Sequence, residues 1–120
     1  MRKGLCLGMN RIIAVDFDGT LCHNAWPDIG PPNEAVIDYI LHQQQTGAKI
    51  ILWTNRTDYR LKQALDWCAN QSLFFDAVNE NLPEVIKLFG GDTRKVYADE
   101  YLDDKMRELP TKVNRRRRRA

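Results

Sequence analysis

The sequence predicts an α/β fold in which a mostly parallel sheet carries helices on both faces. Short apolar runs alternate with segments whose apolar residues recur at helical spacing, giving the order β-α-β-α-β-α-β. The 120 residues are enough for one compact domain but hardly for two. We therefore expect a single Rossmann-like domain that binds ligands beyond the carboxyl ends of its strands.

The first half of the chain predicts two buried strands separated by a helix. Residues 11–17, RIIAVDF, form an apolar run rich in β-branched residues, as expected for a strand buried on both faces. Residues 33–46 have helical spacing, with Asn33 as a plausible N-cap and Gly47 as the stop. Residues 48–54, AKIILWT, form the second buried strand.

The second half continues the alternation. Residues 58–70 place leucines and a cysteine on one helical face, and residues 73–78, LFFDAV, predict a third strand. A short helix is expected after Pro83, because proline suits the first turn of a helix. The segment 95–104, KVYADEYLDD, contains the fourth strand.

Charge divides the chain into a mildly acidic body and a basic tail. The net charge is +2, and removing the five arginines 115–119 leaves −3. We expect an N-terminal extension over 1–10, with Met9 as an alternative start, a folded domain over 11–112, and a disordered tail over 113–120. Such a tail is typically solvated and can contact nucleic acid weakly through phosphates.

Composition indicates a cytoplasmic protein that does not cross a membrane. The chain has three cysteines, an odd number without metal-ligand spacing, which favours reduced thiols over disulfides. Nothing approaches the roughly 18 consecutive apolar residues that a membrane span requires.

Polar residues follow every predicted strand, and parallel strands place their carboxyl ends at one edge of a sheet. In chain order these residues are Asp16 and Asp18; Thr54, Asn55 and Arg56; Asn79, Glu80 and Asn81; and Asp103 and Asp104. A buried carboxylate is costly unless it is paired or bound to a metal ion. The sequence therefore predicts a site at this edge rather than a set of unrelated polar loops.

The stretches DFDGT, LWTNR and YLDD, in this order on an α/β pattern, resemble the haloacid dehalogenase-like (HAD) superfamily. The resemblance covers about residues 11–104 and is nearest to small phosphatase-like members of bacteria and phages. It implies a phosphatase that forms an aspartyl-phosphate, a known use of carboxylate nucleophiles.

The resemblance assigns different roles to the residues of these motifs. Asp16 matches the nucleophile, and Asp18 matches the residue that acts as acid to the leaving group and then as base to water. Gly19 lets the backbone bend and approach closely. Thr54 matches the hydroxyl that holds a phosphate oxygen.

Three further residues have open or supporting assignments. Thr20 and Asn55 are expected beside the substrate, next to the motif residues that they follow. Arg56 either clamps a substrate phosphate or caps a helix.

The last motif implies a Mg²⁺ site. Hard oxygen ligands suit this ion, and Asp16, the Asp18 backbone carbonyl and one or both of Asp103 and Asp104 would supply them. Asp104 is the preferred direct ligand by its match to the family. The cation would also let several carboxylates remain ionised side by side.

The family's lysine has two candidates, Lys95 and Lys87, of which Lys95 is the better match. A straight strand from Lys95 to Asp103 would separate them by about 26 Å, at roughly 3.3 Å per residue. If Lys95 serves the site, the chain must therefore reverse near residues 98–100.

The segment 22–33, CHNAWPDIGPPN, is too short for the cap domain of larger relatives and is expected to form a proline-stiffened loop over an open site. Trp26 in this loop either packs over it or stacks on substrate. An open site suits a phosphorylated small molecule or the end of a nucleic acid, and a second subunit can close it. The alternative function is a nucleic-acid-associated module, or a nucleic-acid end phosphatase, that uses Arg115–Arg119.

Overall fold

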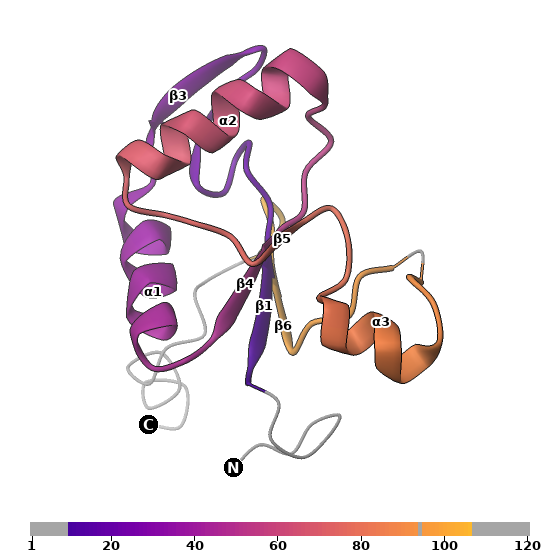
Figure 1. The fold of residues 1–120 in the computed structure, drawn as a ribbon. Coiled ribbons are helices and arrows are strands. Elements are labelled where there is room, and N and C mark those ends of the chain that lie inside the picture. Colours follow the sequence, from indigo (N-terminus) through magenta and orange to yellow (C-terminus); the bar gives the residue numbers. More distant parts are fainter. Residues whose placement is uncertain (1–9, 94, 107–120) are drawn as a thin grey trace.

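The computed structural model describes residues 10–93 and 95–106. Four parallel strands form the central sheet in the order β5-β4-β1-β6 (Figure 1). Their bounds are Ile12–Val15 for β1, Lys49–Leu52 for β4, Ala77–Val78 for β5 and Glu100–Leu102 for β6. The sheet confirms the predicted α/β fold.

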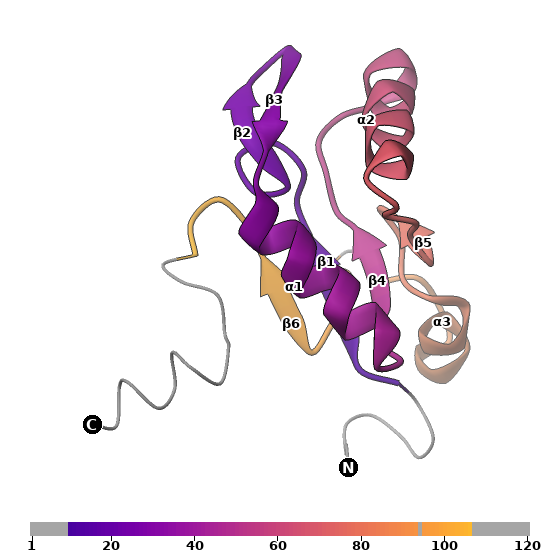
Figure 2. The ribbon, with the colours of Figure 1, turned by 90° about the vertical axis from the view of Figure 1, so that its left-hand side faces the viewer.

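Helices cover both faces of this sheet, as predicted. They are α1 (Glu34–Gln45), α2 (Asp58–Asn70) and α3 (Pro83–Phe89). Side chains alternate along β1, so Ile13 and Val15 join the cluster of α1 and α2, whereas Ile12 and Ala14 join the cluster of α3. Figure 2 shows α3 separated from α1 by the strands. This alternation assigns each strand residue to one face and therefore decides which residues reach the site.

The segment expected to be a loop after β1 is instead a two-stranded hairpin. Strands β2 (Cys22–Ala25) and β3 (Asp28–Pro32) pair antiparallel beyond the carboxyl end of β1 (Figures 1 and 2). The hairpin was not predicted because the segment contains three prolines, and proline within a run normally argues against a strand. Gly30 is required there, since a Cβ atom would lie 2.2 Å from the carbonyl oxygen of His23. No cap domain separates the hairpin from α1.

The third strand is shorter than predicted. Only Ala77–Val78 pair with β4, because the Leu73 N–H still donates to the Cys68 carbonyl at the end of α2. Leu73 is buried, but Phe74 is 66% exposed and lies outside the sheet. The run LFFDAV therefore combines a core contact, a surface turn and a strand.

The chain reverses direction before β6, which is the condition under which Lys95 could reach the site. The Asp99 N–H donates to the Ile12 carbonyl, and the Asp99 carboxylate accepts from the Ile12 N–H, at 2.7 Å each. Val96 and Ala98 are buried in the cluster of α3. Asp99 thus lies at the amino end of β1, and the segment leading to it runs there from the carboxyl edge, where Lys95 lies.

Cys22 and Cys68 are buried free thiols, and burial raises the pKa of both, to about 12 for Cys68. Cys6, the extension and the arginine tail lie outside the described residues. Within the described ranges, no helix is long and apolar enough to cross a membrane.

Candidate active site

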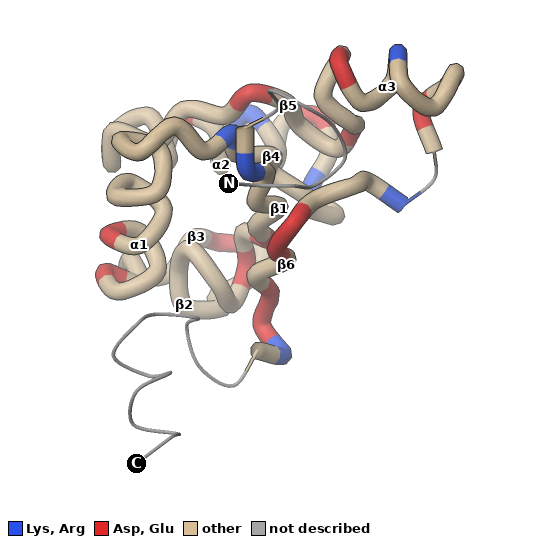
Figure 3. The backbone as a smooth tube through the Cα atoms, turned by 90° about the horizontal axis from the view of Figure 1, so that it is seen from below, with Lys and Arg blue, Asp and Glu red and all other residues tan. Residues whose placement is uncertain are grey.

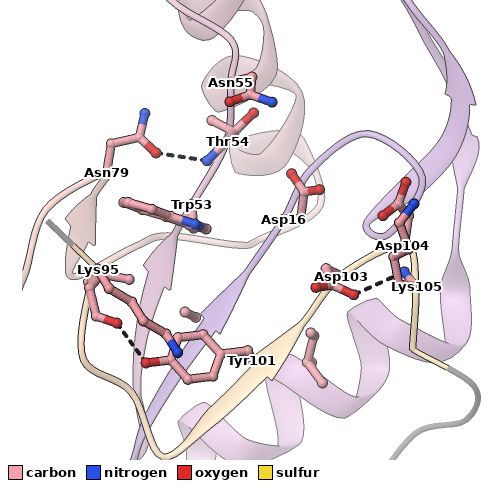
Figure 4. A pocket seen from close by; sticks show the side chains of 13 residues that line it. Asp16, Trp53, Thr54, Asn55, Asn79, Lys95, Tyr101, Asp103, Asp104 and Lys105 are labelled. Atoms are coloured by element: carbon pink, nitrogen blue, oxygen red, sulfur yellow. Dashed lines mark hydrogen bonds between the residues drawn. The ribbon is translucent and has the colours of Figure 1, made fainter.

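Two adjoining cavities open at the carboxyl edge of the sheet. The larger, of about 730 Å³, is lined by residues from all four strand ends (Figure 4). The smaller, of about 390 Å³, lies under the hairpin and is lined by Asp18, Asn24, Trp26 and Arg56 among others. Four predicted site residues line both cavities: Asp16, Thr54, Asn55 and Asp104. The predicted edge therefore carries a concave site.

Asp16 lies at the junction of the two cavities. Its backbone N–H continues the sheet by donating to the Leu102 carbonyl, and its Oδ1 accepts from the Phe17 N–H at 2.7 Å. Burial raises the pKa of Asp16, and of the carboxylates that raise it further Asp104 has the largest effect. Oδ2 has no hydrogen bond to any described residue and is available to a ligand.

The turn after Asp16 packs directly against Asp104. Gly19 has φ +82°, and a Cβ atom added to it would lie 2.9 Å from the Asp104 Cβ. The N–H groups of Thr20, Leu21 and Cys22 converge on the Phe17 carbonyl, which tightens this turn. Glycine therefore permits both the backbone angle and the approach of the two acidic loops.

Thr20, predicted to lie beside the substrate, is instead buried, and it lines neither cavity. The tight turn directs its side chain into the protein, where its hydroxyl has no partner among the described residues. Gly19 also lines neither cavity, so its contribution is steric.

We expect Gly19→Ala to destabilise the protein and to displace Asp104. Gly90→Ala is a matched control, because Gly90 has φ +78° but open space around its Cβ position. The backbone strain of about 1–2 kcal/mol is common to both variants. Any additional loss of stability in Gly19→Ala therefore measures the contact with Asp104. Urea unfolding and a Mg²⁺-dependent thermal shift measure the two effects. Equal stability losses and equal Mg²⁺ shifts in the two variants would contradict this role.

Arg56 lines the smaller cavity, but its side chain is buried and is paired with Asp18. Its Nε and Nη2 donate to the two Asp18 carboxylate oxygens at 2.8 and 2.7 Å, and Nη2 also donates to the Asp28 carbonyl. The guanidinium lies between the rings of Phe17 and Trp26, 5.1 and 4.8 Å from their centroids. The helix-cap role is not observed, because Thr57 is the N-cap of α2, whereas the clamp role stays a prediction. In this structure Arg56 orients Asp18 and connects it to the hairpin.

Thr54 is oriented by its neighbours for donation to a ligand. Its backbone N–H donates to Asn79 Oδ1 at 2.7 Å, and its hydroxyl accepts from the Arg56 N–H at 3.1 Å. Because the hydroxyl accepts this bond, its own proton remains free for an oxygen in the cavity. Sequence reasoning noted Asn79 as polar but did not identify it as the residue that holds Thr54.

Lys95, not Lys87, lines the larger cavity. Its Nζ lies 5.0 Å from the centroid of the Tyr101 ring, and the described residues hold no ion pair between Lys95 and a carboxylate. Buried Asn81 supports this segment by donating to Asp92 and Thr93 and accepting from the Tyr97 N–H. The chain reversal thus returns Lys95 to the predicted edge.

Asp103 and Asp104 follow β6 and remain exposed, and Figure 3 shows them as an acidic stretch that ends at Lys105. Asp103 Oδ1 accepts from the Lys105 N–H at 2.9 Å. No three His, Cys, Asp or Glu side chains in the described ranges converge closely enough to form a metal-binding group. Asp16 and Asp104 nevertheless face the same two cavities, and one or two carboxylates plus waters are enough for Mg²⁺. The donor set therefore fits this cation.

Comparison with known proteins identifies a relative but no activity. A solved structure of a conserved protein coded by a locus of Bacteroides thetaiotaomicron is 34% identical, with a TM-score of 0.72. The match covers 86% of this chain and 84% of that chain. The chain belongs to the same family as this Bacteroides protein. No family model and no curated protein matches the chain, so any inference about chemistry rests on the residues of the site.

Proposed function

We propose that the protein is a Mg²⁺-dependent phosphomonoester hydrolase of the HAD type that works through an aspartyl-phosphate on Asp16. The observation that carries the proposal is the convergence of Asp16, Thr54 and Asp104 on both cavities, with Asp18 lining the smaller one. These positions coincide with the DFDGT, LWTNR and YLDD motifs. A carboxylate, a free hydroxyl proton and a second carboxylate in one concave site suit phosphoryl transfer.

In the first step, Asp16 Oδ2 attacks phosphorus and the bond from phosphorus to the ester oxygen breaks. Asp18, in its protonated form, gives its proton to the leaving oxygen. The Thr54 hydroxyl donates to a phosphoryl oxygen, and Lys95 supplies positive charge on the side of the larger cavity. The Phe17 N–H keeps Oδ1 fixed and so orients the attacking oxygen.

In the second step, the Asp18 carboxylate takes a proton from a water molecule whose oxygen attacks phosphorus. The bond between phosphorus and Asp16 breaks, which releases inorganic phosphate and restores the carboxylate. Mg²⁺, held by Asp16, the Asp18 carbonyl and Asp104, with Asp103 adjacent, would neutralise phosphoryl charge. Arg56 holds the ionised Asp18 carboxylate, the form that acts as base in the second step, and protonation of Asp18 for the first step requires one of these two hydrogen bonds to be released.

The decisive experiment is to trap the covalent intermediate. An aryl phosphate has a good leaving group that needs no acid, so Asp18→Asn should still form the phosphoenzyme but fail to hydrolyse it. Mass spectrometry of the acid-quenched variant should then locate phosphate on Asp16, and EDTA should prevent its formation until Mg²⁺ is restored. Unmodified Asp16 together with rapid turnover in Asp18→Asn would contradict the mechanism.

A further inference from the structure

The larger cavity extends from Asp16 along an aromatic wall that the proposed chemistry does not use. Trp53 and Tyr101 line this wall and are 40% and 41% exposed. The strand register explains why both side chains are on this face. Ala14 on β1 pairs with Ile51 on β4 and with Tyr101 on β6, and Trp53 is two residues beyond Ile51. Both rings therefore belong to the face of the sheet that carries Ala14.

Ala14 leaves room between the two aromatic residues. Its methyl group lines the cavity floor on β1, the strand between β4 and β6. Strands lie roughly 4.8 Å apart, so side chains from β4 and β6 start about 9–10 Å apart. Figure 4 shows the indole and the phenol ring on the same side of the pocket, with the Lys95 side chain beside Tyr101.

The two rings have different tasks. The Tyr101 hydroxyl donates to the Val96 carbonyl at 2.7 Å and accepts from the Ala98 N–H at 3.1 Å, so its ring is fixed as a platform for the Lys95 ammonium. The Trp53 indole N–H has no hydrogen-bond partner among the described residues, and its ring faces the cavity. Trp53 is thus the ring available for stacking, and the Lys95 ammonium lies beside Tyr101.

We infer that this wall binds the base of a nucleoside monophosphate, stacked on Trp53, while its phosphate occupies the site at Asp16. An indole face binds planar rings by stacking, and a base covers more of that face than a phenyl ring does. A volume of about 730 Å³ accommodates a ligand of this size. Only the placement of the phosphate at Asp16 rests on the proposed function; the placement of the base on Trp53 does not.

Equilibrium binding tests the base site without requiring turnover. In an Asp16→Asn background with Mg²⁺, isothermal titration calorimetry would compare guanosine 5′-monophosphate with ribose 5-phosphate and phenyl phosphate. We expect the nucleotide to bind about tenfold more tightly than either, which is within the contribution of one stacked base. Adding Trp53→Ala should remove most of this preference, and adding Trp53→Phe should retain most of it.

Phe74→Ala is the matched control, because Phe74 is also exposed but lies outside both cavities. It should leave the preference unchanged, and circular dichroism checks that each variant is folded. Equal affinity for guanosine 5′-monophosphate and ribose 5-phosphate, or a preference that survives Trp53→Ala, would overturn the base site. Phenyl phosphate binding as tightly as the nucleotide would overturn its assignment to nucleotides.

The same measurements separate this inference from the proposed function. A wild-type protein that hydrolyses no phosphomonoester, while its Asp16→Asn form still prefers the nucleotide through Trp53, disproves the activity and supports the base site. Hydrolysis of ribose 5-phosphate and guanosine 5′-monophosphate with equal kcat/KM, and without any effect of Trp53→Ala on their ratio, supports the activity and disproves the base site.

Discussion

Replacing Asp16 with asparagine is expected to lower phosphomonoester hydrolysis at least about a thousandfold, because loss of the nucleophile leaves only binding and electrostatic stabilisation. Asparagine keeps the acceptor that pairs with the Phe17 N–H, so the turn should persist. Initial rates on an aryl phosphate with Mg²⁺ measure the loss. Asp66→Asn is the control, because Asp66 is an exposed partner of Lys62 on α2 and should keep full activity.

The same substitution should make the protein more stable when no divalent cation is present. Burial and the neighbouring carboxylates raise the pKa of Asp16 above 3.8, so the native state holds its proton more tightly than the unfolded state does. The wild-type protein therefore loses stability as the pH rises from about 3.8 through the native pKa. Asp16→Asn removes this loss, so its Tm in EDTA at pH 7 should exceed that of the wild type.

Lower activity together with a higher Tm in Asp16→Asn would distinguish the loss of the nucleophile from damage to the fold. Retention of most activity in Asp16→Asn would exclude the aspartyl-phosphate. A lower Tm than that of the wild type in EDTA would show that the Asp16 carboxylate contributes more to folding than its raised pKa indicates.

The sequence was sufficient for those features that depend on periodicity and strand order. Short β-branched apolar runs such as 11–17 are typical of central strands, and parallel strands place their carboxyl ends together, so Asp16, Thr54 and Asp104 could be predicted to share an edge. The reversal before β6 was predicted only on the condition that Lys95, and not Lys87, serves the site, because a straight strand would keep Lys95 far from Asp103.

The remaining features depend on contacts between distant residues, which local patterns do not encode. Arg56 follows a strand as a substrate clamp would, but its guanidinium is fixed by Phe17 and Trp26, which come from other segments. Thr20 belongs to the motif and yet points into the protein. Trp53 seemed to be only the apolar end of a strand, although strand alternation combined with the later register places it in the cavity wall.

Arg56→Met should be among the most destabilising single substitutions in the site, costing about 3 kcal/mol. The Arg56 side chain is 1% exposed, and its removal leaves the Asp18 carboxylate, 22% exposed, without its two strongest donors. Removing one partner of a buried pair typically costs about 3–5 kcal/mol, and the partial exposure of Asp18 places this pair at the lower end. Arg56→Lys should restore little, because an ammonium cannot form the bidentate pair or stack between two rings. Urea unfolding measures both variants.

A second consequence concerns catalysis. Without Arg56, Asp18 loses its fixed orientation, so kcat should fall by about a hundredfold, the lower end of what general acid–base catalysis contributes. Arg60→Met is the control, because Arg60 reaches the hairpin through a 3.4 Å bond to the Pro27 carbonyl without pairing with Asp18.

The double variant Asp18→Asn/Arg56→Met measures the free energy by which the two residues are coupled. If the cost of Arg56→Met comes from the carboxylate left unpaired, removing that charge should recover part of the lost stability, giving a coupling free energy of at least about 1 kcal/mol. Additive losses in the double variant would instead assign the cost to packing between Phe17 and Trp26. Coupling in stability together with a lowered kcat in Arg56→Met would establish that Arg56 connects the hairpin to the proposed acid–base residue.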